Sequence, residues 1–313
     1  MIYCMGEALI DFVPVAGEGA PQFAMHAGGA PANVAAAVAK LGGQAAFIGK
    51  IGADPFGDFI AQTLAALGVD VSLLLRAQQA QTTLAFVTLD ARGDRRFSFY
   101  RNPGAETLLS PQEVPETLPA AGDVLHFGSV CLTPSPAREA HRKALRTARR
   151  TGALITFDAN LRPSLWPSEA AMREAVADFI DYADVVKLSE EEFPFVTGRE
   201  KEEDAAQELL MRSAEAVVIS RGGRGAAVYF RDGRMCSHPA YQVRVADTVG
   251  AGDAFWGALL SSLDGVAARD VAAQDWGMML EFACAAAACS VSRPGGISSL
   301  PTFDEAMAMC ARR

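Results

Sequence analysis

Residues 247–255 combine glycines and acids in a spacing that could support group transfer. Gly250 and Gly252 flank Ala251, and Asp253 follows at once, directly before apolar residues that recur every three or four positions. This pattern predicts a tight turn that opens a buried helix. The bare N–H groups of such a turn, at the positive end of the helix dipole, form a site for an anion.

A carboxylate beside an anion site needs an explanation, because it repels a bound phosphate. Asp253 makes chemical sense as a base that takes a proton from an incoming hydroxyl while backbone amides stabilise the charge of a phosphoryl group. The alternative is that Asp253 is only a favourable acid in the first turn of a helix. A lone Gly-x-Gly-Asp does not decide between the two.

A second glycine turn, Gly28-Gly29, precedes Pro31, Asn33 and a helical pattern that ends at Gly42-Gly43. Proline near the first helical position and glycine past the last is the expected asymmetry of a helix. The glycines allow close approach of backbone to a small ligand, and Asn33 offers both a donor and acceptors. Taken alone, the pattern fits a plain strand-to-helix turn equally well. Asp11, further upstream, could cap a turn or bind sugar hydroxyls.

Alternating strand-like and helix-like segments surround these residues. We expect strands at 2–6, 45–48, 124–127, 154–157, 185–187 and 217–220, and helices at about 31–41, 55–67, 137–150 and 276–290, with one more that carries the apolar positions within 255–263. Repeated β-then-α units predict an α/β fold with a mostly parallel sheet covered on both faces. No internal repeat or low-complexity linker divides the sequence, so we expect a single domain over 1–313.

One hairpin interrupts the alternation. Two strand-like segments within 82–101 are joined by a predicted hairpin loop at 91–95. Together with residues of about 11–23, they predict a small β-sheet lid that leaves the main sheet and covers a site. Arg101, at the exit of the hairpin, could bind an anionic or hydroxylated ligand, or could simply be an exposed arginine.

Polar residues follow several of the expected strands, at the end where open α/β sheets bind ligands. Asp158 to Arg162 follow one strand, and Ser189 to Glu192 follow the next. Ser220 ends another strand and leads into the glycine-rich segment 221–225. This segment fits a nucleotide, although a simple hairpin turn is equally allowed.

Composition excludes several classes of protein. The formal net charge of −9 argues against broad binding to nucleic acid or to anionic membranes, and the basic face of segment 137–150 is most simply a solvated face. No basic leader precedes the first strand, and no apolar run is long enough to span a bilayer. The six cysteines lack CxxC or Cys/His metal spacing. We expect a cytoplasmic protein with reduced thiols and no nucleic-acid or membrane partner.

Two segments together resemble the ribokinase/PfkB family of carbohydrate kinases, and its fructokinase branch in particular. One spans the Gly-Gly turn and the next helix start, at 27–57, and the other is 247–255. Found in this order along nearly the whole chain, they are far more specific than either alone. Further segments similar to fructokinases lie at 6–12, 99–105, 158–162 and 187–192.

The resemblance implies a fold and an activity. It implies a three-layer α/β/α sandwich with a central mostly parallel sheet and a small β-sheet lid, paired lid to lid as a homodimer. It also implies an ATP-dependent sugar kinase that uses Mg²⁺, often with a monovalent cation such as K⁺. We expect phosphorylation of the primary hydroxyl of a small sugar, with fructose as the preferred substrate.

The resemblance further implies roles for individual residues. Asp253 would take the proton of the sugar hydroxyl, and the amides of Gly250, Ala251 and Gly252 would form the anion hole. The positions that match substrate-binding residues are Asp11, Gly28, Gly29, Asn33, Phe99, Arg101 and Arg162. The positions that match nucleotide-binding residues are Lys187, Ser220, Gly222, Gly225 and Cys284. The positions that match metal sites are Glu190, for Mg²⁺ through water, and Asp247, Val249 and Gly295, for K⁺.

Two residues depart from the common family pattern. Lys187 occupies a position where many members have asparagine, although the fructokinase branch often has lysine, and it could contact ATP phosphates directly. Its alternative is a surface ion pair, which in solvent contributes only about 0–1 kcal/mol. Cys284 occupies a position where relatives often have asparagine, which affects the expected adenine contacts.

Several other functions compete with a fructokinase. Within the family, they are a 2-keto-3-deoxygluconate kinase, whose substrate carboxylate Arg101 and Arg162 could bind, and an aminoimidazole riboside or nucleoside kinase. Outside it, a non-catalytic nucleotide- or sugar-binding sensor is disfavoured, because a pure binder gains nothing from Asp253 beside a phosphate. A Rossmann-type oxidoreductase is disfavoured because no GxGxxG follows the first strand.

Overall fold

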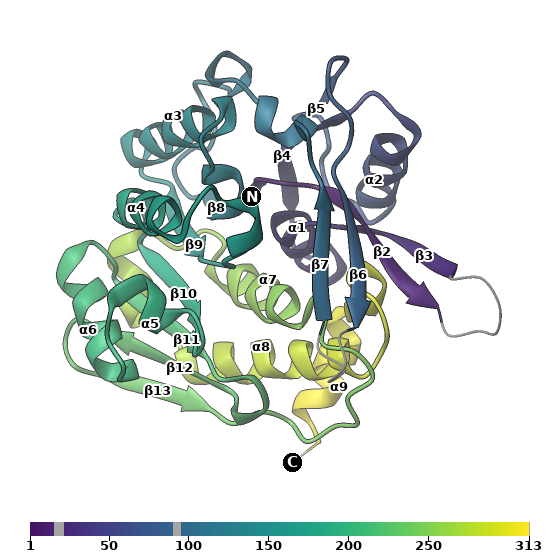
Figure 1. Ribbon diagram of the computed structural model, residues 1–313. Coiled ribbons are helices and arrows are strands. Elements are labelled where there is room, and N and C mark those ends of the chain that lie inside the picture. The colour runs from purple at the N-terminus through teal and green to yellow at the C-terminus, as the bar shows by residue number, and fades with distance from the viewer. Residues whose placement is uncertain (16–21, 90–94, 313) are drawn as a thin grey trace.

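The computed structural model describes residues 1–15, 22–89 and 95–312, and within them nine strands form one large sheet (Figure 1). These strands are β1 (Ile2–Met5), β4 (Ala45–Gly52), β5 (Leu74–Ala77), β8 (Val124–Gly128), β9 (Leu154–Asp158), β10 (Val185–Ser189), β11 (Ala216–Ser220), β12 (Ala226–Phe230) and β13 (Met235–His238). Their order is β13-β12-β11-β10-β9-β8-β1-β4-β5. The pairs from β11 to β5 are parallel, and β12 and β13 are added antiparallel at one edge.

Helices cover both faces of this sheet (Figure 1). They are α1 (Ala30–Lys40), α2 (Pro55–Ala66), α3 (Pro136–Thr151), α4 (Glu169–Ile180), α5 (Phe193–Thr197), α6 (Glu202–Arg212), α7 (Ala251–Leu263), α8 (Trp276–Val291) and α9 (Phe303–Cys310). One core contains residues of α1, α7 and α8, and a second contains residues of α3, α4 and α6. On β1, Ile2 and Cys4 belong to the first core and Tyr3 and Met5 to the second, as the alternation of a strand requires.

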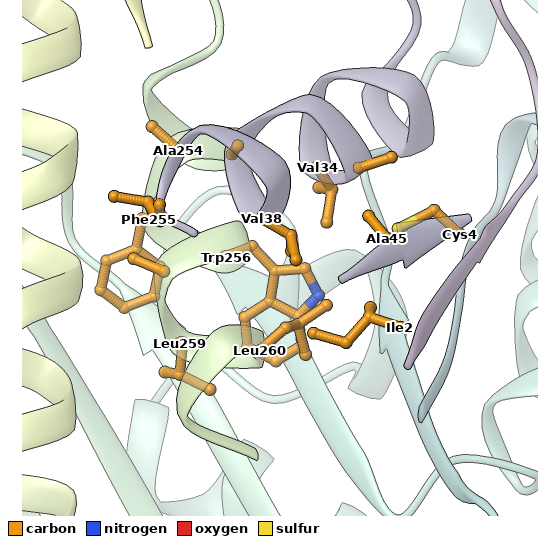
Figure 2. Packing of buried hydrophobic residues seen from close by; sticks show 14 of the residues in the cluster. Ile2, Cys4, Val34, Val38, Ala45, Ala254, Phe255, Trp256, Leu259 and Leu260 are labelled. Atoms are coloured by element: carbon orange, nitrogen blue, oxygen red, sulfur yellow. The ribbon is translucent and has the colours of Figure 1, made fainter. Parts of the chain in front are cut away.

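Close packing of α1 on α7 holds together two segments that are far apart in sequence. A Cβ atom added at Gly257 of α7 would lie 2.5 Å from Cβ of Ala37 on α1, so glycine allows the two helices to approach. Figure 2 shows Trp256 reaching from α7 under Val38 of α1, towards Ile2 of β1. This contact brings the first turns of both helices to the same place.

A small four-stranded sheet stands beside the large one (Figure 1). Its strands are β2 (Leu9–Val15), β3 (Gln22–Gly28), β6 (Leu84–Leu89) and β7 (Arg95–Tyr100), in the order β3-β2-β6-β7. Residues 16–21 and 90–94, which hold part of the expected lid and most of its expected hairpin loop, lie outside the described residues. The prediction of a three-layer α/β/α fold with an additional small β-sheet is confirmed. No helix in the described ranges is long and apolar enough to cross a bilayer.

Candidate active site

A pocket of about 560 Å³ lies at the carboxyl ends of β9, β10 and β11, bounded by the N-termini of α1 and α7 and by the small sheet. The predicted site residues that line it are Asp11, Gly29, Asn33, Phe99, Arg162, Lys187, Ser220, Val249, Gly250, Gly252 and Asp253. The predicted site residues outside its lining are Gly28, Arg101, Glu190, Gly222, Gly225, Asp247, Ala251, Cys284 and Gly295. The fold therefore gathers residues that are distant in sequence at one edge of the sheet.

Asp253 lies in the first turn of α7, directly after a glycine turn in the sequence. Gly250, the residue before the helix, has φ +75°, a left-handed conformation that favours glycine. One carboxylate oxygen of Asp253 accepts a hydrogen bond of 2.8 Å from the side-chain amide of Asn33 on α1. The Oδ1 atom of Asn33 is buried and has no hydrogen-bond partner among the described residues. That acceptor is left for a hydroxyl of a bound ligand.

The surroundings of Asp253 favour its protonated form more than water does. Burial raises the pKa of Asp253 to about 6, and the neighbouring Asp158 carboxylate adds to this rise. The hydrogen bond from Asn33 and the charges of Lys187 and Arg162 act in the opposite direction. A carboxyl with a pKa close to working pH is suited to general-base catalysis.

Lys187 and Asp158 form a buried ion pair at the centre of the pocket. The Nζ atom of Lys187 lies 2.6 Å from Oδ2 of Asp158, and the side chains are 6% and 5% exposed. Burial alone lowers the pKa of Lys187, but the carboxylates of Asp158 and Glu192 raise it above the ordinary value. Lys187 is therefore a cation inside the pocket, close to Gly252 at the start of α7, and not a surface ion pair.

The other end of the pocket depends on two glycines. A Cβ atom at Gly28 would lie 2.1 Å from Oδ2 of Asp11, so the absence of a side chain gives that carboxylate its place. Gly29 has φ +101°, and a Cβ atom there would lie 2.5 Å from the backbone oxygen of Glu7. Gly29 therefore requires glycine, because its φ is positive and the atom it would meet is backbone, whereas at Gly28 the nearest atom is the end of the Asp11 side chain.

The two candidate arginines differ in their environment. Arg101 forms an ion pair of 2.6 Å with Glu106, and both side chains are buried. Glu106 also accepts hydrogen bonds of 2.9 Å from the hydroxyl of Thr83. The charge of Arg101 is thus already compensated behind the pocket wall, whereas Arg162 lines the pocket.

The glycine-rich segment after β11 forms a tight turn into β12. Gly225 has φ +95°, and a Cβ atom there would lie 2.0 Å from the backbone oxygen of His238. Glu190 forms an ion pair with Arg224 of this turn. Cys284, on α8, is buried behind β13, and its thiol lies 3.9 Å from the backbone oxygen of His238. The nucleotide contacts expected of Gly222, Gly225 and Cys284 stay predictions.

Asp247 connects the other two residues that are expected around a monovalent cation, Val249 and Gly295. Its two carboxylate oxygens accept hydrogen bonds from the N–H groups of Val249, at 2.8 Å, and Gly295, at 3.0 Å. For divalent metals, no group of three or more His, Cys, Asp or Glu side chains in the described part of the chain could hold an ion by itself. A divalent ion in this pocket would need most of its ligands from a bound molecule or from water.

Four acids that line the pocket were absent from the predicted site: Glu7, Asp158, Glu191 and Glu192. Glu7 is 4% exposed, accepts a hydrogen bond of 3.2 Å from the N–H of Ala30, and lines the pocket. Glu192 accepts backbone hydrogen bonds from Leu161 and Ser189. Asp158 pairs with Lys187 as described above. The signal for Asp158 was its place directly after a strand; nothing in the sequence marked Glu7 as buried.

A buried acid at a glycine-rich helix start, in a pocket between a three-layer α/β/α fold and a small sheet, defines the ribokinase-like class of small-molecule kinases. The model described as pfkB family carbohydrate kinase matches residues 1–303. The chain belongs to this family.

Similar proteins are known from sequence and from structure. Fructokinase-1 of Oryza sativa subsp. japonica is 43% identical over 314 residues, which cover 98% of this chain and 96% of that protein. The fructokinase of Vibrio cholerae O395, in a fructose, ADP and calcium ion bound form, has a TM-score of 0.89 and 32% identity, covering 99% of this chain and 98% of that one. Aminoimidazole riboside kinase from Salmonella enterica, complexed with aminoimidazole riboside and an ATP analogue, has a TM-score of 0.85 and 32% identity, covering 98% of both chains.

Proposed function

We propose that this protein is an ATP-dependent fructokinase that phosphorylates the primary hydroxyl of fructose. The observation that carries the proposal is the hydrogen bond between Asn33 and Asp253, which places a buried acid between the two ends of one pocket. Asp11 on β2 and Asn33 on α1 supply hydroxyl-binding groups to the pocket, and Lys187 and Ser220 line it from β10 and β11. The 43% identity to a curated fructokinase over nearly the whole chain supports the same substrate.

The proposed reaction is a single in-line displacement. Asp253 accepts the proton of the primary hydroxyl as the hydroxyl oxygen forms a bond to the γ-phosphorus and the bond from that phosphorus to the β-phosphate oxygen breaks. The N–H groups of Gly250, Ala251 and Gly252 stabilise the charge on the transferring group. The ammonium group of Lys187 adds a positive charge beside these N–H groups. Asn33 holds the Asp253 carboxylate so that its other oxygen faces the hydroxyl.

The residues present are compatible with Mg-ATP. The Oδ1 atom of buried Asp158 has no hydrogen-bond partner within the described ranges, so it can accept from a water molecule on a metal ion. When bound with ATP, Mg²⁺ would neutralise phosphate charge. Asp158 and, through water, Glu190 would face this ion, although Glu190 must share its charge with Arg224. Asp247, Val249 and Gly295 are the residues that we propose to lie around K⁺.

Two related substrates compete with fructose. A 2-keto-3-deoxygluconate kinase must compensate a sugar carboxylate, and the pairing of Arg101 with Glu106 removes one of its two expected partners. An aminoimidazole riboside kinase is supported by the structural similarity to the Salmonella enterica enzyme. A coupled assay of ADP release over fructose, tagatose, ribose, 2-keto-3-deoxygluconate and aminoimidazole riboside, with Mg²⁺ and with or without K⁺, separates these substrates. A higher kcat/KM for any sugar other than fructose would contradict the proposal.

The role of Asp253 is tested by Asp253→Asn. We expect kcat to fall by roughly 10²–10⁴-fold, because the amide cannot accept the proton, while ATP affinity is retained. Asp264→Asn is the matched control, since Asp264 lies at the other end of α7 and bonds only the exposed N-terminal amine in the contacts of the described residues. Near-normal turnover of Asp253→Asn would rule out its role as the base.

We also propose that the small sheet is a lid on one domain of residues 1–313 and that two lids pair in a homodimer. Alternate residues of β2 and β7 divide between the two faces of this sheet: Asp11 and Phe99 line the pocket, whereas Phe12 stacks on Phe86 on the outer face. Phe23, Met25 and Tyr100 are 39%, 37% and 67% exposed. We place the enzyme in the cytoplasm, where ATP is available and its free thiols stay reduced.

A further inference from the structure

Three buried polar side chains connect α7 to the centre of the large sheet. The Nε1 atom of Trp256 lies 3.1 Å from Nδ1 of His126 on β8, and the same nitrogen lies 3.2 Å from the hydroxyl oxygen of Thr156 on β9. None of the three residues is more than 1% exposed. The proposed reaction uses none of these groups, so their presence inside an apolar core needs its own explanation.

The geometry determines the direction of the first hydrogen bond. An indole N–H can only donate, so Nδ1 of His126 must be an acceptor and the imidazole must be the neutral form with its proton on Nε2. Burial, with a smaller contribution from the charge of Lys187, lowers the pKa of His126 to about 3, which keeps the ring neutral. The bond from Trp256 to His126 is therefore present throughout the working pH range.

This bond gives the first turns of α7 a second directional contact, on the sheet side, in addition to the bond from Asn33 to Asp253. The indole lies between Val38 of α1 and Ile2 of β1 (Figure 2). Apolar contacts of this kind are non-directional and permit small rotations of a helix, whereas a hydrogen bond weakens steeply when its angle changes. Trp256 stands three positions after Asp253, so both side chains move with the same turn of α7.

A small rotation of α7 would matter at the pocket. A rotation of about 10° displaces a carboxylate that lies about 6 Å from the helix axis by about 1 Å. A displacement of about 1 Å at a reacting group can reduce turnover by roughly 10²-fold. The same rotation would weaken the bond from Asn33 to Asp253, because that bond crosses from α1 to α7.

We propose that Trp256, through its hydrogen bond to His126, is a positioning residue that sets the rotation of α7 and so places the Asp253 carboxylate for proton transfer. This inference rests on the proposed function, in which Asp253 is the base. It assigns Trp256 and His126 to the reaction although neither touches the pocket.

The test compares two tryptophans with the same substitution. Trp256→Phe keeps an aromatic ring and removes the N–H donor; we expect kcat to fall by roughly 10- to 100-fold while the KM values for fructose and ATP change little. Trp276→Phe is the control, because Trp276 is also buried and donates its N–H, to the backbone oxygen of Val271, away from the pocket. We expect both variants to lose a few degrees of Tm and only Trp256→Phe to lose kcat.

A triple variant separates positioning from stability. Trp256→Phe with His126→Leu and Thr156→Val removes all three polar groups, so no buried polar group is left without its partner and Tm should recover in part. We expect kcat to stay low. Recovery of kcat together with Tm, or a kcat of Trp256→Phe equal to that of Trp276→Phe, would overturn the inference. Should the single variant not fold, the kcat of the triple variant is compared with that of Trp276→Phe instead.

A readout that does not need turnover keeps the two proposals apart. Carbon-13 NMR of labelled aspartates, assigned with Asp253→Asn, measures the pKa of Asp253 directly. In Trp256→Phe we expect this pKa to move upward, because the hydrogen bond from Asn33 that lowers it is weakened. If the unmodified protein phosphorylates no sugar, the proposed function fails, and superimposable titrations of Asp253 in the two proteins would then contradict the positioning of Asp253.

Discussion

At the scale of single residues, two buried acids of the pocket have pKa values near neutrality for related reasons. Burial raises the pKa of Asp253 to about 6 and that of Glu7 to about 7. Asp253 is the proposed base that accepts the proton of the sugar hydroxyl, whereas Glu7 accepts a hydrogen bond from the N–H of Ala30 at the start of α1. The ionisation of Asp253 should therefore determine how activity depends on pH, and the ionisation of Glu7 should determine how the free energy of unfolding depends on pH.

The pH dependence of activity follows from Asp253. Only its ionised form accepts a proton, so we expect kcat/KM to fall about tenfold per pH unit below a midpoint near pH 6. Initial rates across pH, with circular dichroism at each pH to show that the protein stays folded, measure this limb. A midpoint near the ordinary pKa of aspartate, about 3.9, would contradict it.

The pH dependence of stability follows from Glu7. Its folded pKa of about 7 exceeds the ordinary 4.5, so the stabilisation by its proton is complete below pH 4.5 and is lost as pH rises through about 7. We expect Glu7→Gln, which mimics the protonated side chain, to raise the free energy of unfolding by about 2–3 kcal/mol at pH about 8 and to change it little at pH about 5.

Urea unfolding at the two pH values measures the effect of Glu7→Gln. Glu174→Gln is the control, because Glu174 is exposed on α4. If the difference in the free energy of unfolding between Glu7→Gln and the unmodified protein were the same at both pH values, the pKa of Glu7 would not be raised in the folded state.

At the scale of elements, the turn between β11 and β12 depends on one glycine. Gly225 combines a positive φ with a backbone oxygen 2.0 Å from where a Cβ atom would lie, so Gly225→Ala must displace either this turn or β13. We expect a loss of about 2–4 kcal/mol of stability and an increased KM for ATP, because strain and a steric clash add. Thermal unfolding and ATP-dependent kinetics measure the two effects.

Gly233→Ala is the control for Gly225→Ala. Gly233 has φ +82° in the neighbouring hairpin, and a Cβ atom there would meet nothing within 4 Å among the described residues. We expect only the strain of the positive φ, about 1 kcal/mol, and an unchanged KM for ATP. Equal KM values for ATP in the two variants would contradict a role of the turn between β11 and β12 in nucleotide binding.

The elements that the sequence predicts best are those with strong apolar signals. The parallel strands from β8 to β11 are buried on both faces and are mainly apolar, with single polar residues at His126, Thr156 and Lys187, and α1 and α8 are also mainly apolar. The short strands β5 and β13 were not predicted, because each has four residues and only sheet pairing defines them. Bounds for α4 and α6 were not predicted either, although the β-then-α alternation required helices there.

The site was predictable where a motif fixes local backbone and unpredictable where it depends on distant partners. The glycine turns place Asp253 and the start of α1, and both are readable from sequence. The pairing of Arg101 with Glu106, and of Lys187 with Asp158, depends on how strands and loops meet in space. No spacing in the chain reveals which acid an arginine or lysine will reach.

At the scale of the whole molecule, the outer face of the lid determines the proposed assembly. We expect light scattering to give about twice 33.1 kDa for the unmodified protein and the monomer mass for Phe23→Glu, because a charge buried in an apolar interface is strongly unfavourable. Phe303→Glu is the control, since Phe303 is 49% exposed on α9, which is not part of the small sheet. A monomeric unmodified protein, or equal masses for the two variants, would contradict lid pairing.

The packing of α1 against α7 has a consequence for the synthesis of the chain. Asn33 and Asp253 are 220 positions apart, and α7 covers the side of α1 that does not pack on the large sheet. At about 5–20 residues per second, a ribosome takes roughly 10–45 s to add that length. During this interval the side of α1 that faces α7 is without its native cover. Chaperone binding early in translation would therefore be of more use to this protein than to one whose first helix packs only on its immediate neighbours.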